Sequence, residues 1–312
     1  MRKGRMNMIQ TAKQYEMLHF VLLEGLKVVT PSMSKTDFCR TITDMMEDDV
    51  PTQQFAVLDA ERPEYKPIEY EAALKNKSKN RNPSILAVDN YKVRLMSTPS
   101  GYINAVNIPG YRTAFGYILT QHPLDNTTTD FLSLVTQERA DTVVSIGPLQ
   151  TKPSWPTNKG SRAKFGNFVV STVKCDNRSV GSEHVEERQI TIENKELGIN
   201  TKLTLLETPS WCQSLPDSSF MLDMIQLIQR RRGIDSPSVI ITCNDGATEC
   251  GLLCAMCNVM ERLETDGDID IMAAVRQLQI RRPQCLPSKS QYVFCYQLVK
   301  EYLEADTVYA NV

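Results

Sequence analysis

The most constraining feature of this sequence is a short apolar run that leads through a polar loop into a helical pattern. Residues 239–242 read Val-Ile-Ile-Thr, which is typical of a buried strand, and Cys243 follows as the first residue of the loop. From Leu252 onward, apolar residues recur at helical spacing. A strand that turns sharply into a helix directs backbone N–H groups and the helix dipole at one point, so it can bind an anion. The same field would favour the thiolate of Cys243, which makes this loop a candidate phosphate site with a nucleophile.

The composition is that of an ordinary globular protein and excludes several classes. The chain has 312 residues, 41% of them hydrophobic, and a net charge of −2, so it lacks the basic excess expected of a protein that binds nucleic-acid phosphates. The longest apolar run, residues 17–29, contains Glu24 and Lys27 and is too short to span a membrane. Nine cysteines at irregular spacing indicate free thiols in a reducing compartment. We therefore expect a cytoplasmic protein with no nucleic-acid partner and no membrane span in this chain.

Strand-like runs and helical periods alternate through most of the chain. Residues 142–146, 168–173, 189–193 and 202–206 are β-branched or alternating runs, which favour strands. Short helices are predicted before them, from residue 34 or 35 to residue 47, where Pro51 prevents continuation, and over residues 53–60. Apolar spacing from Tyr292 to Leu303 indicates a closing helix. This order predicts one α/β (α+β) domain around a mixed sheet flanked by helices.

The two ends of the chain resemble each other. At an offset of 277 positions, residues 5–26 align with residues 282–303. The identical pairs are Arg5/Arg282, Gln14/Gln291, Tyr15/Tyr292, Glu24/Glu301 and Leu26/Leu303. We interpret residues 1–28 as the C-terminal helix of a preceding copy of the same domain, residues 29–50 as a linker with a short helix, and residues 51–312 as a complete domain. The alternative is that two unrelated amphipathic helices share a Gln-Tyr pair.

The loop at Cys243 resembles the signature His-Cys-x5-Arg-Ser/Thr-Gly of the protein tyrosine phosphatases, with Cys243 and Gly251 in their places. Further motifs of that family follow in the same order. They are Lys79-Asn80-Arg81, Tyr102-Ile103-Asn104-Ala105, residues 117–124, Asp130-Phe131, Trp155-Pro156, Arg281-Arg282-Pro283 and Gln291-Tyr292. Residues 8–15 are similar to the family's closing segment. The resemblance implies the tyrosine phosphatase fold and, together with the repeat, the tandem domains of receptor-type members, with the tail of the first domain and all of the second in this chain.

The resemblance assigns the phosphate loop to Cys243, Asn244, Asp245, Gly246, Ala247, Thr248 and Glu249. In the family, the cysteine attacks phosphorus, the arginine at the end of the loop holds two phosphoryl oxygens, and an aspartic acid protonates the leaving tyrosine oxygen. Cys243 keeps the nucleophile, but Glu249 stands at the arginine position and Asp245 adds a second carboxylate. Since a bidentate cation has become an anion, we expect the loop to repel phosphate and to oppose formation of a thiolate. Thr242 and Cys250 replace the family's histidine and hydroxyl on either side of the loop.

The general acid and the substrate-binding residues also depart from the family pattern. Trp211-Cys212-Gln213 aligns with Trp-Pro-Asp and places Gln213, which has no acidic proton, at the acid position, whereas an alignment shifted by four residues supplies Asp217. The resemblance assigns Asn82, Pro287 and Gln291 to the substrate loop. Asn82 replaces the tyrosine that stacks on the substrate ring, and Pro287 replaces the glutamine that positions water. One lost oxyanion donor costs roughly 10²–10³ in rate and a lost acid roughly 10²–10⁴, so we expect a rate lower by roughly 10⁴–10⁷.

These departures resemble the second, catalytically degenerate domain of receptor-type tyrosine phosphatases. The resemblance implies a regulatory or scaffolding domain that binds other protein domains, chiefly an adjacent active phosphatase domain, and that has tyrosine-phosphorylated proteins as further partners. It also implies the intracellular part of a membrane receptor, with no cofactor and no metal. The alternative is a weakly active phosphatase that hydrolyses phosphotyrosine through a cysteinyl-phosphate intermediate at Cys243, with Asp217 as the acid.

Smaller patterns are explained by packing and helix ends. Cys250, Cys254 and Cys257 have the spacing of a radical-SAM cluster motif, but they fall on one face of a predicted helix. Cys243, with no histidine near it in the sequence, is more typical of a buried structural thiol than of a redox-active residue. The run at residues 230–232, three arginines, is typical of a helix C-terminus, with a docking surface as the alternative.

Overall fold

The computed structural model describes residues 9, 11–27, 32–98, 100–181, 183–209, 211, 214–232 and 236–310. The strands are β1 (Met33–Ser34), β2 (Lys92–Arg94), β3 (Tyr102–Ile108), β4 (Tyr117–Gln121), β5 (Thr142–Ile146), β6 (Arg162–Phe165), β7 (Phe168–Val180), β8 (Glu183–Asn194), β9 (Ile199–Thr208), β10 (Val239–Cys243) and β11 (Asp268–Ile269). The α-helices are α1 (Ala12–Lys27), α2 (Lys35–Glu47), α3 (Val50–Ala60), α4 (Glu71–Lys75), α5 (Thr128–Gln137), α6 (Ser218–Arg231), α7 (Thr248–Asp266), α8 (Ile271–Arg281) and α9 (Lys289–Ala310). Short 3₁₀ helices cover Pro67–Tyr70 and Lys77–Lys79.

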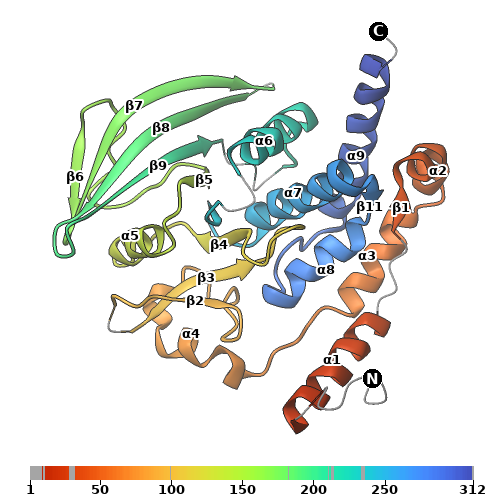
Figure 1. Ribbon diagram of the computed structural model, residues 1–312, viewed down its shortest axis with the longest axis horizontal. Helices are drawn as coiled ribbons and strands as arrows, with labels where there is room; N and C mark the ends of the chain where they lie inside the picture. Colours follow the sequence, from red (N-terminus) through yellow and green to blue (C-terminus); the bar gives the residue numbers. More distant parts are fainter. Residues whose placement is uncertain are drawn as a thin grey trace.

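One large mixed sheet forms the centre of the molecule (Figure 1), in the strand order β2-β3-β4-β10-β5-β9-β8-β7-β6. The neighbours β4, β10, β5 and β9 are parallel, and antiparallel strands extend the sheet on both sides. Every residue of β4, β10 and β5 is buried, as expected for parallel strands covered on both faces. The predicted α/β fold, a mixed central sheet flanked by helices, is confirmed.

Alternate side chains of the central strands enter two cores, one on each face of the sheet. Ile241 of β10 and Leu119 of β4 join the larger core, which α6, α7, α8 and α9 complete. Ile240 and Ile118 belong to the other core, where Phe131 of α5 packs. Figure 1 shows α5 apart from the group formed by α6 to α9. The end of β10 therefore lies between two packed layers, which fixes the position of the loop that follows it.

Most of the predicted elements are present, with some different ends. The strands predicted at residues 142–146 and 239–242 are β5 and β10, and the helix predicted up to residue 47 is α2. The helix predicted at residues 53–60 is α3, which begins at Val50 and has Pro51 in its first turn. The runs at 168–173 and 189–193 are only parts of β7 and β8, and β3 and β4 had not been predicted as strands.

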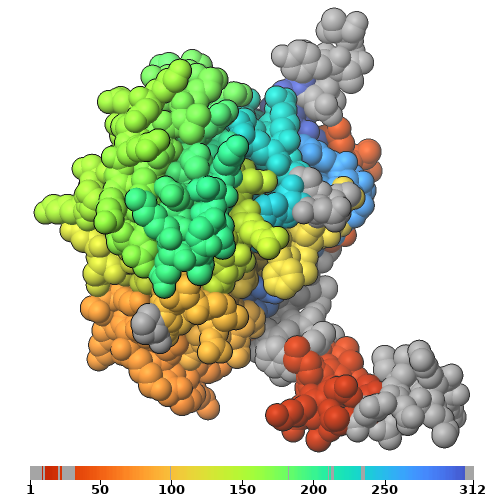
Figure 2. Space-filling model, turned by 60° about the vertical axis from the view of Figure 1, so that its left-hand side comes forward, coloured from red at the N-terminus to blue at the C-terminus, as the bar shows by residue number. Residues whose placement is uncertain are grey.

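The N-terminal helix differs from the rest in its exposure. Tyr15, Met17 and Leu22 of α1 are among the most exposed large apolar side chains of the described residues, and Figure 2 shows α1 (red) at the edge of the molecule. The short helix predicted in the linker is α2, and its Phe38 and Ile42 belong to the larger core. The domain boundaries at residues 28 and 50 stay a prediction. Within the described residues, no helix is both long and apolar enough to cross a bilayer.

Candidate active site

The loop after β10 lies directly on the end of β4. Cys243 is the last residue of β10, its side chain is fully buried, and its carbonyl accepts the N–H of His122 at 2.6 Å. Gly246 has φ 72°, and a Cβ at this position would lie 2.3 Å from the nitrogen of Gln121. Only glycine allows the loop to approach the strand this closely. The strand, loop and helix N-terminus predicted around Cys243 are therefore present.

A carboxylate of the loop itself occupies the N–H groups at the start of α7. Asp245 Oδ1 accepts the N–H of Ala247 at 2.8 Å and that of Thr248 at 2.9 Å, and Oδ2 accepts the Thr248 hydroxyl at 2.5 Å. The Cys243 thiol also donates to Oδ1, at 3.3 Å. Burial alone would raise the pKa of Asp245, but the hydrogen bonds from Thr248, Ala247 and Cys243 together lower it. Asp245 is thus ionised at neutral pH and fills the position that suits an external anion.

Glu249 turns toward a neighbouring segment. It lies in the first turn of α7 with 1% of its surface exposed, and its Oε1 accepts the N–H of Trp211 at 2.7 Å. The residue that the resemblance places at the family's arginine position is therefore a buried hydrogen-bond acceptor that binds the segment between β9 and α6. The sequence alone gave no sign of this contact.

The two candidates for the general acid have different outcomes. Gln213 lies outside the described residues. Asp217 is the exposed N-cap of α6, where its Oδ1 accepts the N–H groups of Ser219 at 2.9 Å and Phe220 at 3.2 Å. This contact explains Asp217 as a helix cap without any catalytic role.

Buried thiols surround the loop. Cys250 Sγ lies 3.6 Å from the carbonyl of Ile241, and burial, together with the neighbouring Cys243, raises the pKa of Cys250 well above its usual value. Burial likewise raises the pKa of Cys285 to about 12.

Cys250, Cys254 and Cys257 are all buried within α7. In the part of the chain that the structure covers, no three potential metal-ligating side chains come together.

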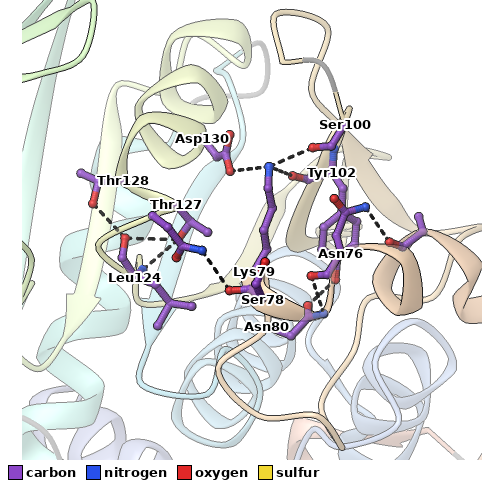
Figure 3. Close-up of polar contacts among 12 residues, drawn as sticks. Asn76, Ser78, Lys79, Asn80, Ser100, Tyr102, Leu124, Thr127, Thr128 and Asp130 are labelled. Atoms are coloured by element: carbon purple, nitrogen blue, oxygen red, sulfur yellow. Dashed lines mark hydrogen bonds and ion pairs between the residues drawn. The ribbon is translucent and has the colours of Figure 1, made fainter.

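The segment at residues 79–81 is hydrogen-bonded to the same strand end. Gln121, in register with Cys243, accepts the N–H of Arg81 at 2.9 Å and donates to the carbonyl of Lys79 at 3.0 Å. Lys79 Nζ lies 2.8 Å from Asp130 Oδ2 and donates to the Ser100 hydroxyl at 2.8 Å, as Figure 3 shows. Gln121 thus joins residues 79–81 to the strand end that lies beside Cys243.

The three predicted substrate-contact residues occupy turns and a helix start. Asn82 follows Arg81, and its Oδ1 accepts the N–H of Ser84 at 2.9 Å. Pro287 is exposed and follows Cys285 by two residues. The charge of Asp245 contributes to the raised pKa of the Cys285 thiol. Gln291 is buried in the first turn of α9. None of these contacts tests the role that the resemblance gave to Asn82, Pro287 or Gln291.

One residue next to the loop was missed by sequence reasoning. His122 stands where the resembling motif has glycine, a difference that could have marked it. It is buried, its Nε2 lies 3.3 Å from the Ser145 hydroxyl, and burial followed by the charge of Arg81 lowers its pKa to about 4. His122 is therefore neutral at physiological pH, and its backbone N–H binds the carbonyl of Cys243.

The clustered arginines are engaged within the protein. Arg231 pairs with Glu187 at 2.6 Å and Arg232 with Glu261 at 2.8 Å. Arg282 is fully buried and donates to Asn104 Oδ1 at 2.7 Å. Two of the three arginines at 230–232 thus hold the end of α6, which favours the helix C-terminus over the docking surface.

Comparison with known proteins agrees with the fold. The family model for the protein-tyrosine phosphatase matches residues 76–301. Receptor-type tyrosine-protein phosphatase U of Gallus gallus is 26% identical over 323 residues, an alignment that covers 96% of this chain and 22% of that protein. Receptor-type tyrosine-protein phosphatase alpha of Mus musculus is 27% identical over 222 residues, covering 67% and 26%. Tyrosine-protein phosphatase non-receptor type 9 of Homo sapiens is 25% identical over 256 residues, covering 74% and 42%. The chain thus spans less than half the length of each of these relatives.

Proposed function

The chain belongs to the protein-tyrosine phosphatase family, and from this premise we propose that its phosphatase-like domain is catalytically inactive and acts through contacts with other protein domains. The observation that carries the proposal is the pair of carboxylates in the loop. Asp245 accepts the N–H groups of Ala247 and Thr248, and Glu249 stands where the family's arginine would bind phosphoryl oxygens. A regulatory or scaffolding role of this kind matches the degenerate second domain of a receptor-type phosphatase.

The electrostatic argument follows from the ionised Asp245. A phosphate dianion in the loop would have to displace this carboxylate from the N–H groups or lie beside it. Two like unit charges 4 Å apart repel by about 4 kcal/mol at an effective dielectric constant of about 20, which is roughly a thousandfold in binding. Without the arginine, no guanidinium at that position offsets this repulsion.

The direct test is release of phosphate from a phosphotyrosine peptide, with the protein compared with Cys243→Ser. We expect no turnover that depends on Cys243, because the arginine donor, the general acid and the charge of the loop all differ from the family pattern. A competent member of the family serves as the positive control. Turnover that depends on Cys243 and lies within about a hundredfold of that control would contradict inactivity.

The second candidate is a weak phosphatase that uses Cys243 and Asp217. It is supported by the retained cysteine alone, since the contacts of Asp217 are those of a helix cap. The same assay decides between the two functions, because the weak phosphatase would lose its activity in both Cys243→Ser and Asp217→Asn.

We also propose that residues 1–28 supply the last helix of a preceding phosphatase domain, residues 29–50 a linker, and residues 51–312 the second domain. The exposure of paired positions supports this proposal. Tyr15, Met17 and Leu22 are 56%, 60% and 54% exposed, whereas their counterparts in α9, Tyr292, Phe294 and Val299, are 0%, 4% and 0% exposed. The face that α9 buries in its own domain is thus uncovered on α1.

On this proposal the main partner is an adjacent active phosphatase domain, and the location is cytoplasmic, in the intracellular part of a receptor. The names of the receptor-type relatives support the second statement. The test is the transcript: we expect a reading frame that continues upstream of Met1 through a second phosphatase-like sequence. A stop codon in frame shortly before Met1 would contradict the tandem arrangement.

A further inference from the structure

We propose that β7 forms a self-complementary edge, through which two copies of this chain pair antiparallel around Asn177. The proposal does not depend on whether the loop at Cys243 is active. It rests on the pairing of the strand, its exposure and the order of its charges.

The outer edge of β7 is unpaired over half its length. β6 pairs only with Phe168–Ser171 of β7, and Thr172 exchanges hydrogen bonds with Gly160 and Ser161 at 2.8 and 3.1 Å. From residue 173 to residue 180, among the residues that the structure describes, the only partner strand is β8. Figure 1 shows this part of β7 at the rim of the sheet. Residues 176–179 are all exposed, so a partner strand could reach them.

The register of the hairpin fixes which backbone groups face outward. Val180 and Glu183 pair across a two-residue turn, and such a pair exchanges hydrogen bonds. Since hydrogen-bonded and outward positions alternate, Arg178, Asp176 and Lys174 bond to β8, and Ser179, Asn177 and Cys175 direct their N–H and C=O groups outward. At the bulge between Thr172 and Lys174, the alternation of inward and outward backbone groups shifts by one residue. Three alternate residues, Cys175, Asn177 and Ser179, therefore offer their backbone groups to a second strand.

The charges and the free part of the edge together select one register for pairing with a second copy. A two-fold axis at Asn177 matches the whole segment from Lys174 to Val180 with itself and places Asp176 opposite Arg178 of the other copy, twice. An axis at Cys175 would also oppose Asp176 and Lys174, but it would place Arg178 opposite Thr172, whose backbone is already bonded to Gly160 and Ser161. An axis at Asp176 would oppose two aspartates and would place Lys174 opposite Arg178. Directly opposed side chains in antiparallel strands are close enough to attract or repel, so the register at Asn177 is favoured.

Charges on an edge strand normally discourage pairing, and here they would discourage most other partners. At the Asn177 register they become attractive. In the single chain, Asp176 pairs with Lys174 and Arg178 pairs with Glu187, but the side chains of Lys174, Asp176 and Arg178 are each about half exposed. The exposed pair of Lys174 and Asp176 contributes little to stability. Glu187 is buried, but it keeps its pair with Arg231 at 2.6 Å when Arg178 turns to the other copy.

The experiment is sedimentation velocity of the chain from about 10 µM to about 1 mM, a range suited to interfaces of the small, weak class. We expect a dimer that grows with concentration. Asp176→Arg and Arg178→Asp should each weaken it at least about tenfold, because each opposes like charges twice. An equimolar mixture of the two variants should form a dimer again, since each then meets the opposite charge.

Two further variants separate pairing from folding. Asn177→Pro removes an outward N–H and leaves the bonds to β8, so it should abolish the dimer while the far-ultraviolet circular dichroism stays unchanged. Lys202→Asp, on β9 between two strands, makes the same change in charge as Arg178→Asp and should leave the dimer intact. A wild-type chain that stays monomeric to about 1 mM, a dimer that survives Asn177→Pro, or a mixture that stays monomeric would each overturn the proposal.

Discussion

At the scale of single residues, Glu249 makes a contact opposite in kind to that of the arginine that the resemblance places at this position. A guanidinium here would donate to phosphoryl oxygens, whereas Glu249 accepts the N–H of Trp211. Asp245 in turn takes the N–H groups at the start of α7. The polar groups of the loop are therefore hydrogen-bonded to one another and to Trp211, and we expect that no single substitution turns the loop into a working phosphate site.

We therefore predict that Glu249→Arg alone will not produce a working phosphatase. The new guanidinium could bind phosphate, but Asp245 would remain in the loop and Asn82 in the substrate segment, with glutamine at the aligned acid position. Phosphate release should stay within about tenfold of the unchanged protein, since an acid and its proton transfer alone contribute 10²–10⁴. Full recovery of rate would show that Trp211 has been aligned with the wrong position of the family.

At the scale of elements, short-range sequence patterns predict the buried strands, but they do not predict the strands whose place depends on pairing within the sheet. The runs at residues 142–146 and 239–242 are continuously apolar because β5 and β10 are covered on both faces. The outer half of β7 is polar and exposed, so no alternation marked it as a strand. β3 and β4 carry β-branched and aromatic residues that favour strands, although their sequences stand out chiefly as family motifs.

The same limit applied to the site. Cys243, Asp245 and Glu249 were identified because they are close in sequence, but the contact of Glu249 with Trp211 joins residues 38 positions apart. His122 was overlooked for the same reason, since only the parallel pairing of β4 with β10 brings it to the loop. Motif spacing predicted the composition of the site, whereas its hydrogen bonds depend on strand order.

The cap of α6 gives a prediction at this scale. Asp217→Ala removes the acceptor for the N–H groups of Ser219 and Phe220 and should lower the free energy of unfolding by about 1 kcal/mol, measured by urea denaturation. Asp217→Asn can still cap the helix and should cost only a few tenths of that amount. If both variants leave stability unchanged, Asp217 is not held as a cap, and its candidacy as an acid is strengthened.

At the scale of the whole molecule, stability depends on pH through the buried His122. Its pKa in the folded protein is about 4, below the ordinary value of 6.5. The unfolded chain therefore binds the proton first, so this residue contributes stability above about pH 6.5, and the contribution is lost as the pH falls toward 4. The full difference corresponds to about 3 kcal/mol. Among the carboxylates, Asp245 acts below this window because its pKa is lowered, whereas burial raises the pKa of Glu207 and of Glu264.

We predict that His122→Gln flattens the pH dependence of unfolding between pH 6.5 and 4, because glutamine keeps a polar side chain at this position and does not titrate. Urea denaturation at several pH values should show the unchanged protein losing up to about 1.4 kcal/mol per pH unit more than the variant. His184→Gln, at an exposed position of β8, is the matched control and should follow the unchanged protein. Equal slopes for all three proteins would mean that His122 titrates alike in the folded and unfolded chains, and its burial would then not hold it neutral down to pH 4.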